Sequence, residues 1–353
     1  MVNLLAAQWG DLFTNVGDIT GAASGSSRDE TIVWVGTENR QHFLGHISSL
    51  GVKGEPVFPM STAGGMEDRI GGAAGWALSE WAEQCRSREG LVVIPHFPVP
   101  HAETVAAVVN GVVDGLELRD WHTPSMDTFA VHEWYRLLNC GFRVAAVGGT
   151  DKMSAGMPVG GVRTYAHIGD DEFGFPAWAA AVRAGRTYTT SGPLMEFRVE
   201  GHAAGDEIAL PKGGGTLQVT ASAQATAPLS ALQIVFNGEP VAQVEAKEGE
   251  RALRFQGEIE VPRAGWLAAR CISAHKAWHV WPINIGAHTS PVYVTVDDAG
   301  PFDASIGQYL ITTMQGSLEW LDTLATRADT QRQAELRAVI DRAIETVRAR
   351  ASG

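Results

Sequence analysis

Short apolar runs alternate with amphipathic segments along the first 195 residues of the chain. The runs whose length suits buried strands lie at residues 31–35, 91–95, 112–116 and 144–150. The segments whose apolar side chains recur at helical spacing lie at residues 75–88, 104–110, 132–139 and 175–184. Strands that alternate with helices predict a mostly parallel sheet or a (β/α) barrel.

The pattern changes after residue 195. In residues 196–300, short strand-like runs follow one another without helices between them, separated by turn signals such as Asn237-Gly238. This pattern predicts a β-sandwich. From residue 304 to 351 the chain becomes charged and carries an apolar stripe at helical spacing, which predicts two helices packed against the body. We therefore expect an α/β domain at 1–195, a β-sandwich domain at 196–300 and a helical tail at 301–353.

Composition and charge narrow the possible partners. The 353 residues are 45% hydrophobic and 19% charged, as is ordinary for a core-forming protein. The formal net charge of −13 argues against a nucleic-acid partner, because such a partner needs a basic patch. No apolar run approaches the roughly 18–20 residues that span a bilayer, so we expect no membrane partner. No signal peptide is visible, which makes a cytoplasmic location the default expectation. The cysteines, Cys85, Cys140 and Cys271, are too far apart to indicate a disulfide framework or a cysteine zinc site.

Metal-capable side chains follow the predicted strands one by one. Glu38, His96, Glu117 and Asp151 each come just after an apolar run, and His46 lies close behind Glu38. In α/β barrels the chemistry lies at the C-terminal ends of the strands, so these residues would meet at one rim. Imidazole and carboxylate are ligands that Zn²⁺, Mn²⁺ and Fe²⁺ accept. The spacing therefore predicts a metal site, although each residue taken alone could also be structural.

Several stretches together resemble one family of enzymes. The stretches that resemble the motifs of PHP-type metal-dependent hydrolases are VGTENRQ at 35–41, LGH at 44–46, VIPHFP at 93–98 and GGTDKM at 148–153. Further stretches resemble the CehA/McbA branch, the carbaryl-hydrolase-like metallohydrolases: VRTY at 162–165, AVRAG at 181–185, TSGPL at 190–194 and AHTSPV at 287–292. The resemblance extends over essentially the whole chain, and it is the order and combination of the motifs that make it specific.

The resemblance implies a fold and a set of site residues. The fold would be a distorted (β/α) barrel of the PHP type, followed by a β-sandwich and a helical tail. The implied metal ligands are Glu38, His46, His96 and Asp151. Either Glu38 or Asp151 would accept a proton, and Lys152 would polarise a carbonyl, pair with Asp151 or point into solvent. The residues expected to orient the ligands or to touch substrate are His42, His101, Glu117 and Arg163.

The chain departs from the family pattern in two places. No His-x-His precedes His42, and residues 1–10 resemble the helix that leads into the second strand of the family's barrel. We therefore expect a barrel that is incomplete at its N-terminus, with its open edge covered by another segment or by a second copy of the chain in a homodimer. Met153 stands where most relatives place a histidine, and a thioether is a poor ligand for these cations, so we expect one or two metal ions.

The function that the resemblance implies is hydrolysis assisted by a divalent metal, with zinc as the first choice and manganese or iron as alternatives. The substrate would be a small aromatic ester, carbamate or amide. One alternative is a PHP-type phosphoesterase, in which Arg40, Lys152 or Arg163 would bind the oxygen anions. The other alternative is a catalytically impaired relative that serves as a binding module.

Overall fold

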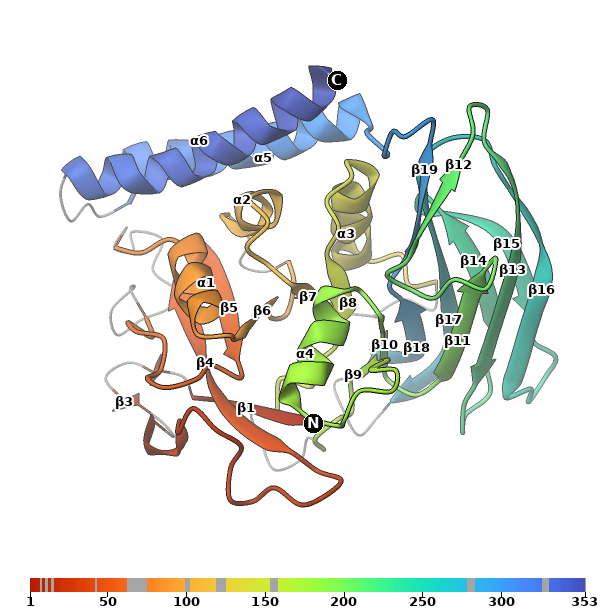
Figure 1. Cartoon of the computed structure of the whole chain (residues 1–353), viewed down its shortest axis with the longest axis horizontal. Coiled ribbons are helices and arrows are strands. Elements are labelled where there is room, and N and C mark those ends of the chain that lie inside the picture. The colour runs from red at the N-terminus through yellow and green to blue at the C-terminus, as the bar shows by residue number, and fades with distance from the viewer. Residues whose placement is uncertain are drawn as a thin grey trace. The chain divides into compact units, whose positions relative to one another are not determined.

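The computed structural model describes most of the chain. The described residues are 1–6, 8–9, 12–13, 16–41, 43–61, 75–98, 102–118, 125–152, 158–277, 283–325 and 330–352. They form a mixed α/β structure with several sheets and six α-helices, labelled in Figure 1. The chain divides into two compact units. The first comprises Met1–Asp114, Phe173–Ala179 and Ala304–Gly353, and the second comprises Gly115–Glu172 and Ala180–Asp303.

The strands of the first unit carry the candidate chemistry. They are β1 (Val2–Ala6), β4 (Val33–Gln41), β5 (Gly45–Leu50) and β6 (Leu91–Ile94), with the short pair β2 (Gln8–Trp9) and β3 (Leu12–Phe13) and a 3-10 turn at Val16–Asp18. β1 runs parallel to β4, whereas β4 with β5 and β5 with β6 are antiparallel. The mostly parallel order expected for this region is therefore wrong for these strands.

The start of the chain also differs from the expectation. Residues Val2–Ala6 form a strand and not a helix. Their backbone pairs with β4 from Val2 opposite Val33 to Ala6 opposite Thr37. A short apolar run does not by itself distinguish a strand from a helix, and here the pairing with a distant strand decides the outcome. β1 also covers this edge of β4.

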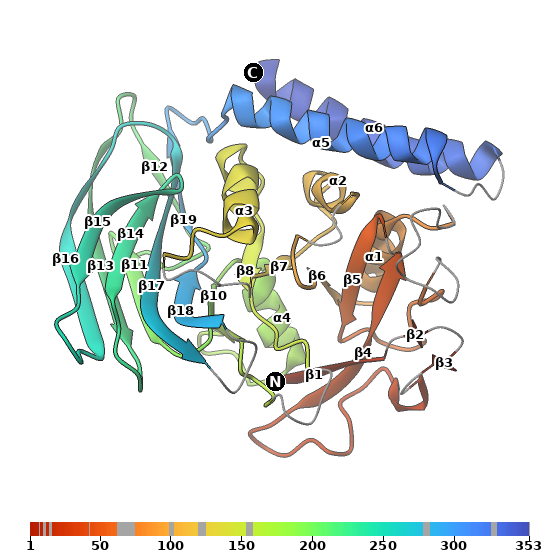
Figure 2. The same ribbon diagram turned by 180° about the vertical axis from the view of Figure 1, so that it is seen from behind.

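The helices of the first unit lie close to their predicted positions. They are α1 (Leu78–Ser87), α2 (Thr104–Val109), α5 (Ala304–Thr323) and α6 (Thr330–Ser352). α1 buries Trp81, Ala82 and Cys85 on one face and packs against β5 and β6. α5 and α6 lie side by side as a hairpin that packs against α2 (Figure 2). Of the apolar stripe predicted for the tail, Leu324 is exposed, and the other members are buried, namely Trp320, Leu321, Leu336, Ile340 and Ile344.

A buried carboxyl group joins α1 to α2. Glu103, just before α2, is 1% exposed and accepts hydrogen bonds from the backbone N–H groups of Leu78 (2.7 Å) and Ser79 (3.0 Å) and from the Ser79 hydroxyl (3.0 Å). It thus pairs donors at the N-terminus of α1 that have no partner within the helix. Burial raises the pKa of Glu103 to about 7. The hydrogen bonds from Ser79 and Leu78 lower this pKa, but the effect of burial is larger.

The second unit contains two sheets that share one core. The unit also contains two helices, α3 and α4, and the parallel strands β7 and β8. Residues of α4 up to Ala179 belong to the first unit. The elements, in chain order, are β7 (Gly115–Glu117), α3 (Phe129–Asn139), β8 (Ala145–Val147), β9 (Arg163–Ala166), α4 (Phe175–Arg183), β10 (Thr187–Thr190), β11 (Leu194–Val199), β12 (Glu207–Leu210), β13 (Gly215–Gln224), β14 (Ala231–Phe236), β15 (Glu239–Glu245), β16 (Ala252–Val261), β17 (Gly265–Ala277), β18 (Ile283–Thr289) and β19 (Val292–Val296). β11, β13 and β16 form one antiparallel sheet. The larger sheet has the order β12-β19-β17-β18-β10-β9, and the β14–β15 hairpin also pairs with β17.

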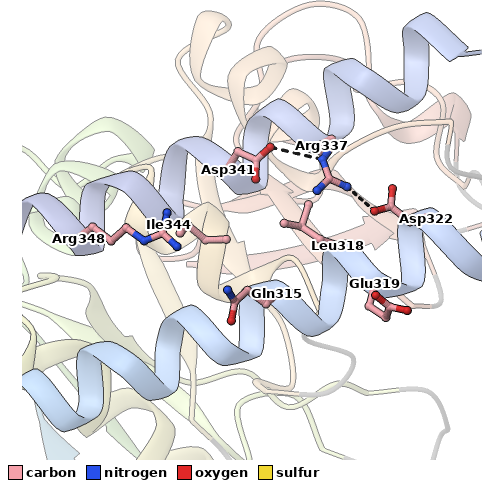
Figure 3. Close-up of a pocket in the computed structure, with 8 residues that line it drawn as sticks. All are labelled: Gln315, Leu318, Glu319, Asp322, Arg337, Asp341, Ile344 and Arg348. Carbon is pink, nitrogen blue, oxygen red and sulfur yellow. Dashed lines mark hydrogen bonds and ion pairs between the residues drawn. The ribbon is translucent and has the colours of Figure 1, made fainter.

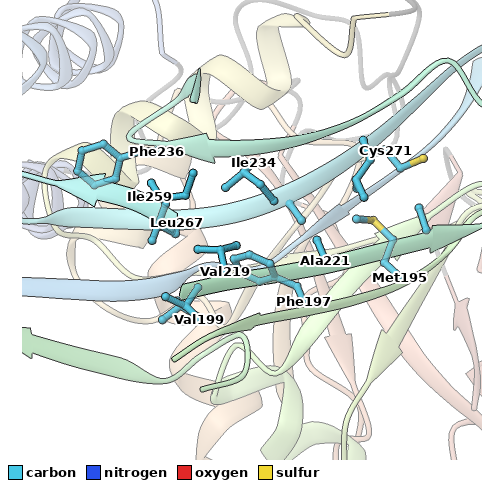
Figure 4. Close-up of a cluster of buried hydrophobic side chains, with 14 of the residues drawn as sticks. Met195, Phe197, Val199, Val219, Ala221, Ile234, Phe236, Ile259, Leu267 and Cys271 are labelled. Atoms are coloured by element: carbon cyan, nitrogen blue, oxygen red, sulfur yellow. The ribbon is translucent and has the colours of Figure 1, made fainter. Parts of the chain in front are cut away.

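Alternating side chains of the two sheets point toward each other. Met195, Phe197 and Val199 on β11 are buried while the residues between them are exposed. They meet Ile234 of β14 and Leu267 of β17 in a buried apolar cluster (Figure 4). Two antiparallel layers with a shared core are typical of a β-sandwich, as the period of two predicted.

Two details of the sandwich differ from the expectation. β10 pairs with β18, with Tyr188 opposite Thr289, and β9 pairs with β10, so the larger sheet includes strands from before residue 196. β12 and β19 are parallel, so the layers are not purely antiparallel. The expected strands at residues 232–236 and 267–272 are confirmed as parts of β14 and β17. The division into domains at residues 195 and 300 stays a prediction.

Glu103 makes stability depend on pH. Because folding raises its pKa from 4.5 to about 7, its stabilising contribution is complete below pH 4.5 and is lost as the pH rises through 7. We expect the free energy of unfolding to fall by about 1–3 kcal/mol more between about pH 5 and about pH 8 in the wild type than in Glu103→Gln. Denaturant titrations at both pH values measure this difference, with the exposed Glu258→Gln as control. The same pH dependence in wild type and Glu103→Gln would contradict it.

Candidate metal centre

Three metal-capable side chains from neighbouring strands converge in the first unit. Glu38 lies in β4, His46 lies in β5 and His96 follows β6. Nδ1 of His46 and Nε2 of His96 are 3.2 Å apart, and each lies 3.3 Å from Oε1 of Glu38. The side chains are only 8–16% exposed. This group could hold a metal ion.

The distances between the three atoms fit a small divalent cation. Ligand atoms about 2.0–2.1 Å from a tetrahedral zinc ion are separated from one another by about 3.3–3.4 Å. The observed triangle has sides of 3.2 Å and 3.3 Å. The alternative is a hydrogen-bonded cluster in which the imidazole nitrogens donate to Oε1 of Glu38 or one imidazole donates to the other. A metal ion would require both nitrogens to be free of protons.

The β4–β5 ladder places two of the candidate ligands on one face. In this antiparallel register Glu38 lies opposite Ser48, and Arg40 lies opposite His46. Because successive side chains of a strand point to opposite faces, these four share a face, and Asn39 points to the other. Glu38 therefore lies inside a strand, and the expectation that it comes just after the end of its strand is wrong. His96 does follow its strand, as expected.

Asn39 fixes the opposite face of the same ladder. It is completely buried, and its amide group donates to the carbonyls of Val57 (2.7 Å) and Pro59 (3.0 Å). Its Oδ1 accepts from the hydroxyls of Thr37 (2.8 Å) and Ser49 (3.2 Å). A buried amide that is satisfied in this way holds the two strands and the 57–59 segment in one arrangement.

Unusual backbone conformations place the two histidines. Gly45, directly before His46, has φ 138°, which a residue with a side chain rarely adopts. His96 itself has φ 35°, in the left-handed region that costs a non-glycine residue about 1–3 kcal/mol. Strain of this size persists when the surrounding structure imposes it, and it is concentrated at functional sites.

Arg40 determines which oxygen of Glu38 faces the histidines. Its Nη2 lies 2.8 Å from Oε2 of Glu38, which leaves Oε1 directed at His46 and His96. Burial alone would raise the pKa of Glu38, but hydrogen bonds from His46 and His96 and the charge of Arg40 hold that pKa well below its usual range. The carboxyl group is therefore ionised at neutral pH, as a metal ligand must be.

The other predicted site residues of the described chain belong to the second unit. Glu117 is the last residue of β7, and a Cβ added to Gly149 would lie 1.8 Å from its Oε1. Asp151 follows β8, is half-buried and has φ 48°, and the side chain of Lys152 beside it is exposed. Arg163, on β9, donates to the carbonyl of Gly160 (3.2 Å). That Asp151 completes the metal centre stays a prediction.

Three residues named from the sequence lie outside the described residues, namely His42, His101 and Met153. Sequence reasoning missed the structural role of Asn39. Alternation along a strand would have revealed it, because a polar residue between Glu38 and Arg40 must face the opposite side. A surface pocket between α5 and α6 contains none of the candidate ligands. There Arg337 bridges Asp322 and Asp341 (Figure 3).

Comparison with protein-family models, curated proteins and solved structures finds no match. None of the helices in the described part of the chain is both long and apolar enough to cross a membrane. The function must therefore be argued from the geometry of the site.

Removing the Asn39 amide should destabilise the fold. Asn39→Ala leaves two buried carbonyls and two hydroxyls without this partner, so we expect the free energy of unfolding to fall by about 2–4 kcal/mol. Asn110→Ala is the matched control, because its amide donates to the carbonyl of Val339 (3.0 Å) at a less buried position. We expect Asn110→Ala to lower the free energy of unfolding by only about 1 kcal/mol. Urea denaturation of both variants measures the difference, and equal losses would contradict the role given to Asn39.

Proposed function

We propose that this chain is a metal-dependent hydrolase whose metal centre includes Glu38, His46 and His96. The observation that supports this most strongly is the triangle of one carboxylate oxygen and two imidazole nitrogens, 3.2–3.3 Å apart and nearly buried. Three protein ligands with a further position for water or substrate are the usual arrangement of a catalytic zinc site. Two imidazoles and a carboxylate also suit Mn²⁺ and Fe²⁺, and zinc is our first choice.

A divalent cation bound there would lower the pKa of a coordinated water and polarise the scissile carbonyl. The chain's own residues would hold and orient the reactants. Glu38 is a weak candidate for the proton acceptor, because Oε1 faces both histidines and Oε2 is bound by Arg40. From the resemblance, Asp151 would either accept the proton or hold the metal as a further ligand beside the water. Lys152 would polarise the carbonyl, and Glu117 and Arg163 would contact the ligands or the substrate.

The finer parts of the proposal come from the resemblance to the PHP-type hydrolases. They are a distorted (β/α) barrel of the PHP type, a small aromatic ester, carbamate or amide as substrate, and a homodimer. The described β4 and β5 would contribute the glutamate and the Gly-His motif of that family, and the loop after β6 would contribute His96.

Metal content tests the proposal. The full chain, purified without chelator, is expected to hold about one divalent ion per molecule. We expect His46→Ala and His96→Ala each to weaken metal binding by about 100-fold or more. Removing a residue that only hydrogen-bonds to a metal ligand lowers metal affinity by about 10–100-fold, and removing a ligand itself should cost more. His202→Ala is the matched control, since that histidine is exposed in the second unit and should leave metal content unchanged. Elemental analysis gives the stoichiometry. Equal metal content in all four proteins would refute this centre.

Turnover identifies the reaction class. We expect the metal-loaded chain to hydrolyse aryl esters or aryl carbamates, and chelation to abolish the activity until metal is restored. Glu38→Gln should lower kcat strongly while the fold, followed by circular dichroism, stays intact. Turnover of phosphate esters alone would favour the phosphoesterase. Tight metal binding without turnover of any of these substrates would favour the binding module.

A further inference from the structure

The C-terminal helix α5 contacts the residues that connect β4 to β5. Phe43 lies in this connection, and its ring stacks on Trp320 of α5 with ring centroids 4.3 Å apart and planes 15° apart. Trp320 is 3% exposed, whereas Phe43 is half-buried. These residues are far apart in the sequence, but both belong to the first unit.

One backbone hydrogen bond and two from the Gln41 side chain also fix the connection. The carbonyl of Leu44 accepts from the backbone N–H of Glu103 (2.8 Å), and Oε1 of Gln41 accepts from the N–H groups of Phe43 (2.7 Å) and Leu44. Leu44 is itself almost completely buried. These hydrogen bonds therefore hold the residues that connect β4 to β5 in a fixed position.

α5 contacts the neighbouring chain segment as well. The Ser317 hydroxyl donates to the carbonyl of Ala102, one residue before Glu103. Ser317 and Trp320 are three residues apart and so share one face of α5. This face of α5 therefore contacts Phe43 through Trp320, and through Ser317 it contacts Ala102, next to the residue whose N–H donates to Leu44. Figure 2 shows α5 alongside α2, which begins at Thr104.

The position of this connection decides where His46 points. Gln41 pairs with Gly45 at the end of the ladder, and His46 is the next residue. A shift of the pairing by one residue would turn every side chain of β5 to the other face, which would remove His46 from Glu38 and His96. Even a small displacement of the turn moves the imidazole, because only Gly45 separates it from Leu44.

We propose that Trp320 is a positioning residue for the metal centre, which acts by stacking on Phe43 and so fixing the turn that precedes His46. This inference rests on the proposed metal centre. It assigns to the C-terminal helices a role in metal retention, although no candidate ligand lies on them. The role is indirect, since Trp320 acts through the turn.

Cobalt binding to the full chain tests this role. Co²⁺ is the probe, its d–d absorption reports the geometry of the site, and competition with a chelator gives the dissociation constant. We expect Trp320→Ala and Phe43→Ala each to raise that constant about 10-fold or more, in the range found for partners that orient metal ligands. The double variant should be little worse than either single one, because both remove the same stack. Trp320→Phe keeps an aromatic ring and should restore binding and the spectrum.

Leu310→Ala is the matched control. Leu310 is also fully buried on α5, but it lies ten residues from Trp320 in the sequence, which is about 15 Å along a helix. It should lower the denaturation midpoint and leave Co²⁺ affinity unchanged. Equal affinity in Phe43→Ala and wild type, or an equal loss in Leu310→Ala, would overturn the role of Trp320 while the metal centre stands. If Trp320→Ala does not fold, Phe43→Ala decides alone. A wild type that binds no Co²⁺ would overturn the metal centre itself.

Discussion

The close approach of Glu38, His46 and His96 is the constraint on which the rest of the first unit depends. Three atoms that can each offer a lone pair lie 3.2–3.3 Å apart where little solvent reaches them. Without a cation, hydrogen bonds that share protons among the two imidazoles and the carboxylate would hold the three atoms together. With a cation bound there, neither of the two nitrogens would carry a proton. We therefore expect metal binding to release protons from this centre.

The two faces of the β4–β5 ladder have different roles in holding this arrangement. One face carries Glu38, Arg40 and His46, and the other carries the hydrogen-bonded Asn39. The unusual backbone at Gly45 and the rings that hold the adjoining turn add to this fixed arrangement. Sites built on strands in this way are more rigid than sites built on loops.

The sequence predicted the three candidate ligands that converge and most elements, but not how β4 is built. The apolar run at residues 31–35 was expected to end before Glu38, whereas β4 continues to Gln41. In the structure Gly36 lies within β4, where an added Cβ would come within 2.2 Å of the carbonyl oxygen of Ser49. This glycine thus permits close approach of strands, which no local pattern reveals. The sandwich strands were easier to predict because their period of two is clear, as in β11. The strand at Val2–Ala6 was missed because its partner β4 is distant in sequence.

Diffraction data collected at the absorption edge of the bound metal test the central claim most directly. The account predicts one anomalous peak within about 2.0–2.2 Å of Oε1 of Glu38, Nδ1 of His46 and Nε2 of His96. The same map would show whether Asp151 supplies a further ligand. No peak at the triangle in crystals grown with saturating zinc, with both imidazoles donating hydrogen bonds to Glu38, would contradict the account.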